Sequence, residues 1–411
     1  MHPVIILHHH EIILKGENRR YFERQLMKNV RISLRGVVAP GAIRGGYGRS
    51  IIDLAPGSTP GEAEQRLTGV FGLSNICTGL RIEQEADSIC RAAGEILEGR
   101  EFKTIRVETR RVDKNFPVSS MALNARVGEY LCTRFSVRAN LSRPDETIYI
   151  ELVDGAAYVY RSKLKGPGGL PVGVSGRVAA LLSAGFDSPV AAWQMMKRGA
   201  SVIFVHFHSM PYTSVRSVEQ VRQIVAALTR YQFQSKLFLV PFAESQNEII
   251  LRTPQPLRVI LYRRMMIRIA EAVARRERAE ALATGESIGQ VASQTLRNIR
   301  VINDAASLPV LRPLSGSDKE DIMSLARTIG THDLSKEQND DCCSYLAPRN
   351  PATWADPSEV REAETTLDIP GLVEKALGAT TSERFSSPAA ADDEEVERHA
   401  VEEPAGDPTI N

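Results

Sequence analysis

The chain has 411 residues, 43% of them hydrophobic and 25% charged, a length that exceeds one typical core and predicts two or three domains. It contains no apolar run of about twenty residues and no charged-then-apolar leader, which disfavours a membrane span or a secretory signal and favours a cytoplasmic protein. Its five cysteines lack zinc-site spacing, which argues against a structural metal and a disulfide framework.

The charges are distributed unevenly along the chain. Residues 356–411 carry 15 acidic and 4 basic residues, which leaves 47 basic and 35 acidic residues in residues 1–355. A basic body fits a polyanionic partner held through phosphate contacts, although an excess of arginine also serves ordinary solubility. Charge alone therefore leaves a nucleic-acid partner open.

The first 160 residues alternate short strands and helices. A strand over 4–7 is followed by a helix over about 19–31. In a second block, from about residue 60, the pattern predicts helices over 87–97 and 119–135 and strands over 104–108, 147–152 and 157–160. Such mixing is typical of α+β domains.

A stretch rich in glycine and proline, residues 166–173, cannot hold a helix or a central strand and is expected to be a linker or a domain-entry loop. Beyond it, strands and helices alternate strictly, which predicts a doubly wound parallel sheet. The expected order is strand 177–182, helix 189–198, strand 201–207, helix 216–231, strand 236–241, helix 256–276 and strand 281–284. From about residue 380 the composition predicts disorder.

The most informative stretch is residues 181–189, Leu-Leu-Ser-Ala-Gly-Phe-Asp-Ser-Pro. An apolar strand that leads through a small hydroxyl-bearing loop into a helix indicates a phosphate cradle, because helix N-termini favour anions. The spacing is not that of a P-loop, and Gly185 alone is too few glycines for a dinucleotide fingerprint. ATP is therefore the first candidate ligand, and a turn without a ligand is the alternative.

The loop resembles the Ser-Gly-Gly-x-Asp-Ser loop of the pyrophosphatase-type ATP enzymes. Ala184 replaces the first glycine, and a positive φ at that position would cost about 1 kcal/mol. Further stretches extend the likeness, namely residues 14–20, 110–117, 168–173, 263–266, 284–295, 310–319 and 337–343. With these, the chain up to about residue 353 resembles the tRNA 4-thiouridine synthases, also called tRNA uridine 4-sulfurtransferases.

The resemblance implies an α/β fold with four parts. They are a ferredoxin-like domain over 1–58, a THUMP RNA-binding domain over 59–165, an adenine-nucleotide hydrolase domain with a parallel sheet over 166–355, and an acidic tail over 356–411, disordered from about 380. No cysteine follows Cys343, so the likeness is to the short form without a rhodanese domain. The implied partners are tRNA and a cysteine desulfurase as sulfur donor, and a homodimer is expected.

The implied cofactors are ATP and Mg²⁺. By resemblance, Asp187 is assigned to Mg²⁺ or to orienting the loop, while Arg263 and Lys319 are assigned to the charge of the leaving pyrophosphate. The positions that match the family's nucleotide contacts or line its loop are Leu181, Leu182, Ser183, Gly185, Ser188, His206, Phe207, Arg263, Gly285 and Gln294. For His206, the alternative to a nucleotide contact is a hydrogen-bonded strand histidine.

Four basic residues match the RNA-binding region. Phosphate contacts to the acceptor end of the tRNA are implied for Arg110, Arg111, Lys114 and Lys163. Phosphate contacts supply affinity rather than base readout. Solvated surface charge is the alternative for each residue.

From sequence alone, the adjacent Cys342 and Cys343 are expected to be two free thiols. By resemblance, Cys343 carries sulfur as a persulfide, and Cys342 is a candidate resolving thiol. The implied reaction adenylates O4 of the uridine at tRNA position 8 and then delivers sulfur to C4, which gives 4-thiouridine. Two alternatives stay open: a non-catalytic tRNA-binding protein with a decayed ATP loop, and another adenylating or thiolating enzyme of the same fold.

Overall fold

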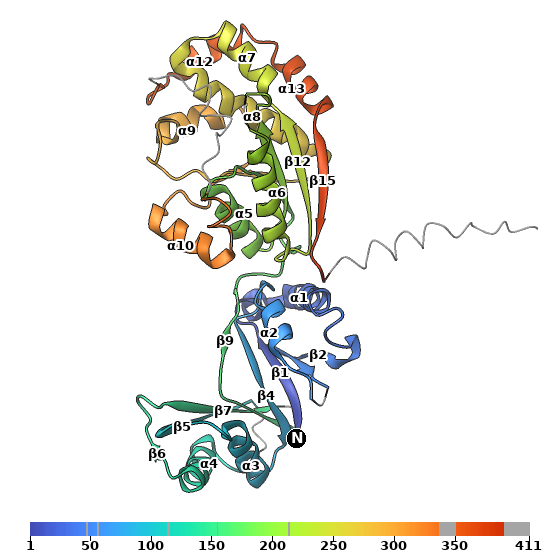
Figure 1. The fold of residues 1–411 in the computed structure, drawn as a ribbon, viewed down its shortest axis with the longest axis vertical. Helices are drawn as coiled ribbons and strands as arrows, with labels where there is room; N and C mark the ends of the chain where they lie inside the picture. The colour runs from blue at the N-terminus through green and yellow to red at the C-terminus, as the bar shows by residue number, and fades with distance from the viewer. Residues whose placement is uncertain are drawn as a thin grey trace, which may run out of the picture. The chain divides into compact units, whose positions relative to one another are not determined.

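The structure is a computed structural model that describes residues 1–46, 48–55, 57–112, 116–153, 155–212, 214–336 and 351–389. The chain folds as two compact units, Met1–Leu170 and Pro171–Asn411, whose elements are labelled in Figure 1. Three of the predicted site residues, Lys114, Cys342 and Cys343, lie outside the described residues. None of the described helices is long and apolar enough to cross a membrane.

The first unit is built on one continuous sheet with the strand order β2-β3-β1-β4-β8-β7-β5-β6, to which β9 adds by pairing with β4. The strands are β1 (His2–His8), β2 (Ile43–Gly46), β3 (Arg49–Asp53), β4 (Asn75–Glu83), β5 (Thr104–Arg111), β6 (Arg138–Ala139), β7 (Glu146–Val153), β8 (Ala156–Tyr160) and β9 (Leu164–Lys165). The helices are η1 (Glu11–Asn18), α1 (Arg19–Ser33), η2 (Pro40–Ala42), α2 (Gly61–Leu67), α3 (Ala86–Leu97) and α4 (Ser120–Phe135).

Strand β4 joins the two parts that the sequence divides near residue 58. It pairs antiparallel with β1 along one edge and with β8 along the other. An ideal Cβ at Gly79 of β4 would collide with the backbone carbonyl of Val159, so this close strand pairing requires glycine. Backbone hydrogen bonds therefore run without interruption from the ferredoxin-like part into the α+β part.

A buried cluster of charged and polar side chains lies in this sheet, centred on Glu151 of β7. Its carboxylate accepts hydrogen bonds from Arg49 Nη1 at 2.6 Å and the Tyr160 hydroxyl at 2.7 Å, and it lies 2.7 Å from His8 Nε2. Burial alone would raise the pKa of Glu151. The hydrogen bonds and the charges of its partners outweigh burial and lower that pKa to about 2. The cluster joins β1, β3, β7 and β8.

Glu151→Gln is expected to destabilise the first unit by roughly 3–5 kcal/mol, because it leaves the buried Arg49 without its counter-charge. Since folding lowers the pKa of Glu151 from 4.5 to about 2, its stabilisation is complete above pH 4.5 and disappears as the pH falls toward 2. Hydrogen exchange of β1 and β7 at pH 7 and pH 3 measures both effects. Glu129→Gln, at an exposed position, is the control; equal exchange in the two variants would contradict the prediction.

The second unit contains a six-stranded sheet in the order β14-β13-β10-β11-β12-β15. Its strands are β10 (Arg177–Leu181), β11 (Ser201–His208), β12 (Gln234–Pro241), β13 (Ala281–Ala283), β14 (Val310–Leu311) and β15 (Thr381–Ser386). Its described helices are α5 (Asp187–Lys197), α6 (Val215–Thr229), α7 (Ala243–Arg252), η3 (Gln255–Leu257), α8 (Arg258–Arg276), η4 (Ala292–Gln294), α9 (Leu296–Asn303), α10 (Lys319–Ile329), α12 (Pro357–Glu364) and α13 (Ile369–Gly378). All pairs are parallel except β12 with β15, which confirms the predicted parallel sheet.

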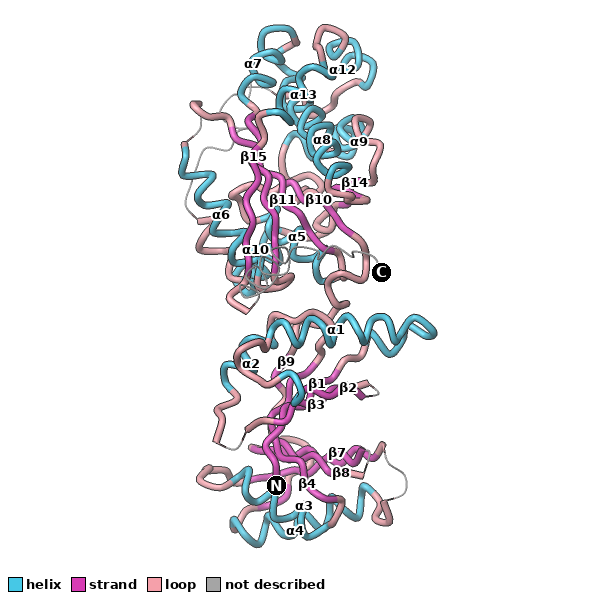
Figure 2. Tube along the Cα trace, turned by 90° about the vertical axis from the view of Figure 1, so that its right-hand side faces the viewer, coloured by secondary structure: helices cyan, strands magenta, loops and turns pink. Residues whose placement is uncertain are grey.

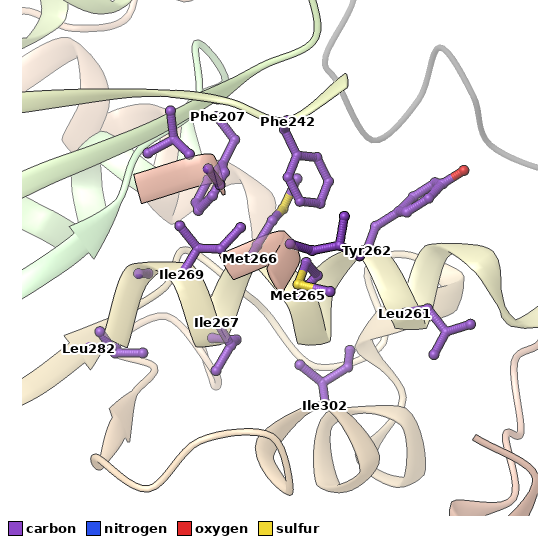
Figure 3. Packing of buried hydrophobic residues seen from close by; sticks show 14 of the residues in the cluster. Phe207, Phe242, Leu261, Tyr262, Met265, Met266, Ile267, Ile269, Leu282 and Ile302 are labelled. Atoms are coloured by element: carbon purple, nitrogen blue, oxygen red, sulfur yellow. The ribbon is translucent and has the colours of Figure 1, made fainter. Parts of the chain in front are cut away.

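Alternating residues of β11 divide between the two faces of this sheet. Ile203, Val205 and Phe207 belong to the core cluster that α8 fills, and Figure 3 shows Phe207 and Phe242 above Met266 and Ile269 of that helix. The crossovers β10–α5–β11 and β11–α6–β12 step along the sheet in one direction, whereas the connection from β12 through α8 to β13 steps back in the opposite direction. Because such connections are right-handed, α8 lies on the face of the sheet opposite to α5 and α6. Figure 2 shows α6 and α8 on opposite sides of the strands. His206 therefore faces away from α8.

The sheet has a topological switch point between β10 and β13. These two strands are neighbours, but the chain leaves β10 toward β11 and leaves β13 toward β14 on the other side. In sheets of this kind, ligands bind at the switch point, outside the carboxyl ends of the strands. The predicted phosphate loop follows β10 at this edge.

The expectation of a disordered tail from about residue 380 is wrong for residues 381–386. This segment forms β15, which pairs antiparallel with β12 and covers that edge of the sheet. Upstream of it, Glu364 of α12 is buried and forms ion pairs with Arg264 and Arg268 of α8 at 2.7 Å and 2.6 Å. Local composition suggested an acidic tail over residues 356–411, because composition does not register that arginines elsewhere in the chain neutralise an acid such as Glu364.

Candidate functional site

The loop after β10 closes on the first turn of α5. The Ser188 hydroxyl accepts a hydrogen bond from the Ser183 backbone N–H at 2.8 Å and lies 3.1 Å from the Ser183 hydroxyl. The N-terminus of α5, with its partial positive charge, is thus fixed beside the loop. The described non-glycine residues with positive φ are Ser136, Phe233 and Arg278, so Ala184 carries no such backbone strain.

Asp187, at the start of α5, connects three segments that are far apart in the sequence. Its carboxylate accepts from Lys319 Nζ at 3.0 Å and from Gln290 Nε2 at 3.3 Å. Lys319 begins α10, and Gln290 lies in the loop after β13. The two predicted residues Asp187 and Lys319 therefore meet, with both side chains partly exposed.

Gly285 lies two residues after the end of β13 and packs against the same helix start. A Cβ at this position would lie 2.6 Å from the Ser188 backbone nitrogen and 2.8 Å from the Asp187 carbonyl carbon. Real Cβ contacts are not that short, so a larger residue would displace backbone. The loop after β13 can pack this closely on the start of α5 because residue 285 is glycine.

Glu286, the next residue, is a buried acid to which the sequence assigned no role. It accepts from Arg263 Nη1 and Arg312 Nε, each at 2.6 Å, and from the Thr284 hydroxyl at 3.1 Å. Burial alone would raise its pKa, but the charges of Arg263 and Arg312 outweigh burial and lower it. The available sequence signal was one acid, Glu286, in a matched stretch, with arginines at 263 and 312 in two other matched stretches. The contact of Arg263 with pyrophosphate stays a prediction.

The residues at the ends of β10 and β11 tie the two strands together. The Leu182 N–H donates to the Val205 carbonyl at 2.8 Å, and the Leu182 carbonyl accepts from His206 Nδ1 at 2.8 Å. His206 is therefore a hydrogen-bonded strand histidine beside the loop, while Leu181 ends β10. Phe207 faces the α8 core instead.

Gln294 lies at the end of η4, in the loop that also carries Gln290. The residue is 7% exposed, and its side-chain Oε1 has no hydrogen-bond partner among the described residues. Buried polar atoms nearly always have a partner, so an orphaned oxygen indicates a place for a ligand donor.

Both flanks of the stretch 337–350 are held at this edge of the sheet. Before it, the Ser335 hydroxyl donates to the Gly185 carbonyl at 3.4 Å, and the His332 ring lies 5.3 Å from that of Phe186. After it, the Thr353 carbonyl accepts from the Thr295 hydroxyl at 2.9 Å. The stretch that carries both predicted sulfur-handling cysteines thus begins and ends beside the candidate site.

The described cysteines, Cys77, Cys90 and Cys132, all belong to the first unit. Burial raises the pKa of Cys77 to about 12 and also raises that of Cys90. Both are therefore neutral thiols at pH 7, which suits packing rather than nucleophilic chemistry.

The predicted RNA contacts differ in their surroundings. Arg110 is exposed at the end of β5, whereas Arg111 Nη1 donates to the Val118 carbonyl at 3.0 Å and so supports the following loop. Lys163 is exposed, and its Nζ lies 3.7 Å from the centroid of the Tyr149 ring. This cation–π contact holds the ammonium group against the ring.

Comparison with known proteins agrees with this architecture. The family profile described as thiamine biosynthesis protein (ThiI) matches residues 173–369, the ThiI ferredoxin-like domain matches 4–77, and the THUMP domain matches 83–161. A probable tRNA sulfurtransferase of Brevibacillus brevis is 39% identical, over 94% of this chain and 97% of that protein. One from Thermus thermophilus is 41% identical, over 90% of each.

A solved structure resembles most of the chain. It is a 4-thiouridine synthetase in complex with RNA and bound ATP, with a TM-score of 0.85, 33% sequence identity, and coverage of 94% of this chain and 100% of that one. A protein from Pyrococcus horikoshii Ot3 is similar at a TM-score of 0.60 and 26% identity, over 80% of this chain and 99% of that one.

Proposed function

Because the chain belongs to the family of tRNA sulfurtransferases, we propose that it is an ATP-dependent enzyme that converts the uridine at position 8 of tRNA to 4-thiouridine. One observation carries the proposal: the phosphate loop, the Asp187–Lys319 pair and both flanks of the stretch with Cys342 and Cys343 meet at one edge of the parallel sheet. Adenylation and sulfur delivery need these groups around one reacting base.

The donor set fits a nucleoside triphosphate with Mg²⁺. The N-terminus of α5 and Lys319 supply positive charge for phosphates, and the orphaned Gln294 Oε1 can accept from a base or ribose group. Mg²⁺ at phosphate sites is commonly held by one or two carboxylates together with the substrate's own phosphates. Asp187 is the matching carboxylate.

The first step activates the uridine. Its O4 attacks the α-phosphorus of ATP, the bond between the α-phosphorus and the bridging oxygen of pyrophosphate breaks, and the proton on N3 of the uracil passes to solvent. Lys319 and the α5 N-terminus stabilise the negative charge that develops on the leaving pyrophosphate. The product carries an adenylyl group on O4. AMP that includes this oxygen is a far better leaving group than the oxygen of the unmodified carbonyl.

The second step exchanges oxygen for sulfur. The outer sulfur of a Cys343 persulfide attacks C4, and AMP leaves with the former O4. The Cys342 thiolate then attacks Cys343 Sγ, which breaks the remaining S–S bond, releases 4-thiouridine and leaves a Cys342–Cys343 disulfide. A cellular dithiol reductant restores both thiols, which is favoured because a disulfide between neighbouring residues is strained.

The enzyme needs a sulfur donor and a binding surface for tRNA. A cysteine desulfurase in the cytoplasm supplies the persulfide sulfur, and the enzyme acts as a homodimer. Phosphates of the tRNA acceptor end are bound by Arg110, Arg111, Lys114 and Lys163, which supply affinity without reading bases. The exposure of Arg110 and Lys163 supports this role.

Nucleoside mass spectrometry tests the function directly. Unmodified tRNA is incubated with the protein, Mg-ATP, a cysteine desulfurase and cysteine, and the digested nucleosides are separated. The expected product is one 4-thiouridine per tRNA, formed only when ATP is present. A different thionucleoside would favour another enzyme of the same fold, and tRNA binding without any thionucleoside would favour a non-catalytic protein.

Gly285→Ala is expected to weaken ATP binding by roughly tenfold or more. The new Cβ must push the start of α5 away from the β13 loop, and a displacement of about 1 Å at a preorganised site has effects of this order. Isothermal titration calorimetry with ATP measures it. Gly378→Ala, where a Cβ meets nothing within 4 Å, is the matched control. Equal affinities in both variants would show that the close packing of Gly285 on the start of α5 does not affect nucleotide binding.

A further inference from the structure

Trp354 is a large aromatic side chain on the surface of the second unit. It is 71% exposed, whereas Trp193, the chain's other tryptophan, is 6% exposed. A single exposed apolar residue is common, but an exposed tryptophan gives up a large burial energy. The contacts around Trp354 indicate a role for its exposed ring.

The backbone on both sides of Trp354 is fixed to α9 and to the loop before it. The Thr353 carbonyl accepts from the Thr295 hydroxyl, and the carbonyl of Ala352 and the N–H of Ala355 both bond to the buried side chain of Asn298. Thr295 directly follows Gln294, the residue with the orphaned oxygen at the candidate ATP site. The ring is therefore presented by a rigid frame at the edge of that site.

Arg297 makes a cation–π contact with this ring. Its guanidinium carbon lies 5.1 Å from the ring centroid, and its nitrogens are held by the Ala355 carbonyl at 2.8 Å and Asp356 at 3.1 Å. Arg300, one turn further along α9, is exposed on the same side of the helix. An aromatic face with neighbouring arginines is the combination that binds single-stranded nucleic acid, because bases stack on the ring and phosphates contact the cations.

We propose that Trp354, backed by Arg297, is a stacking platform for an unstacked nucleobase of the tRNA strand at the mouth of the ATP site. This inference rests on the proposed function. A uridine whose O4 must reach the α-phosphorus of ATP cannot remain stacked within the folded RNA, and enzymes that act on a base take it out of the stack. The platform holds the opened strand by replacing lost base stacking with stacking on the indole.

Tryptophan fluorescence of the wild-type protein tests the inference without any turnover. Binding of unmodified tRNA is expected to quench the exposed tryptophan and to protect it from acrylamide, while Trp193 is already shielded by burial. An acceptor-stem hairpin that lacks the target uridine should bind without this change. A mobility-shift assay on the same samples establishes that RNA is bound.

Kinetics of variants provide the second measurement. Trp354→Ala should lower kcat/KM for tRNA by about 5- to 100-fold, which is the range expected for one lost base–aromatic stack. Trp354→Phe should recover most of the activity, and the affinity for ATP without tRNA should not change in either variant. Leu251→Ala, at a position that is 78% exposed on α7, is the control for loss of an exposed apolar side chain.

The outcomes separate this inference from the proposed function. Bound tRNA that leaves Trp354 emission unchanged would overturn the platform and leave the thiolation reaction standing. Protection of Trp354 by the cysteine desulfurase instead of tRNA would also overturn it, because the ring would then be a protein-docking residue. Failure of the wild-type protein to bind tRNA would refute both proposals.

Discussion

Cys343→Ala is expected to abolish 4-thiouridine formation, by at least about 10³-fold, while tRNA-dependent release of pyrophosphate from ATP continues. The reason is that the two steps use different groups. Adenylation needs the phosphate loop and Lys319, whereas the cysteine is the covalent carrier of sulfur, and removal of a covalent nucleophile eliminates its step entirely. Measurements of pyrophosphate and thionucleoside on the same samples separate the two.

The control for this experiment is Cys132→Ala, which removes a partly exposed thiol in the first unit. It should leave both products at wild-type levels. Adenylated tRNA should accumulate in the Cys343 variant, because activation proceeds without sulfur delivery. Loss of pyrophosphate release together with thiolation would show that Cys343 supports the fold of the site instead of carrying sulfur.

Lys319→Ala is expected to have the opposite pattern and to lower tRNA-dependent pyrophosphate release by about 10²–10³-fold. Loss of one preorganised charge at the position where transition-state charge develops has effects of this size. In the structure the ammonium lies 3.0 Å from Asp187 at the start of α5, so the lysine is held beside the phosphate loop. Thiolation then falls in parallel, since no activated uridine forms.

Two further variants sharpen the Lys319 experiment. Lys319→Arg keeps the charge and should retain part of the activity, although its planar group fits a different geometry. Lys375→Ala removes an exposed lysine that also pairs with a carboxylate, Glu244, and should have no effect. If Lys319→Ala released pyrophosphate at the wild-type rate, the lysine would be only a surface partner of Asp187.

Local sequence signals were sufficient for most of the elements. Strict alternation of apolar strands and amphipathic helices after residue 176 predicted the parallel sheet, because periodicity is a property of neighbouring residues. The phosphate loop was also local: its strand, small residues and helix start lie within nine positions. In contrast, β4 and α7 were not predicted, although they have nine and ten residues. The strands β2, β3 and β14 were also not predicted, because such short elements carry too few residues to establish a period.

Residue types close in the sequence therefore determined the class of fold, the family and the candidate loop. Only the tertiary structure decided which distant groups meet: Lys319 and Gln290 at Asp187, two arginines at Glu286, Glu364 under α8, and β15 at the sheet edge. The physical reason is that propensity and periodicity act along the chain, whereas ion pairing, close backbone approach and edge pairing depend on strand order. Strand order is set by the packing of the whole domain.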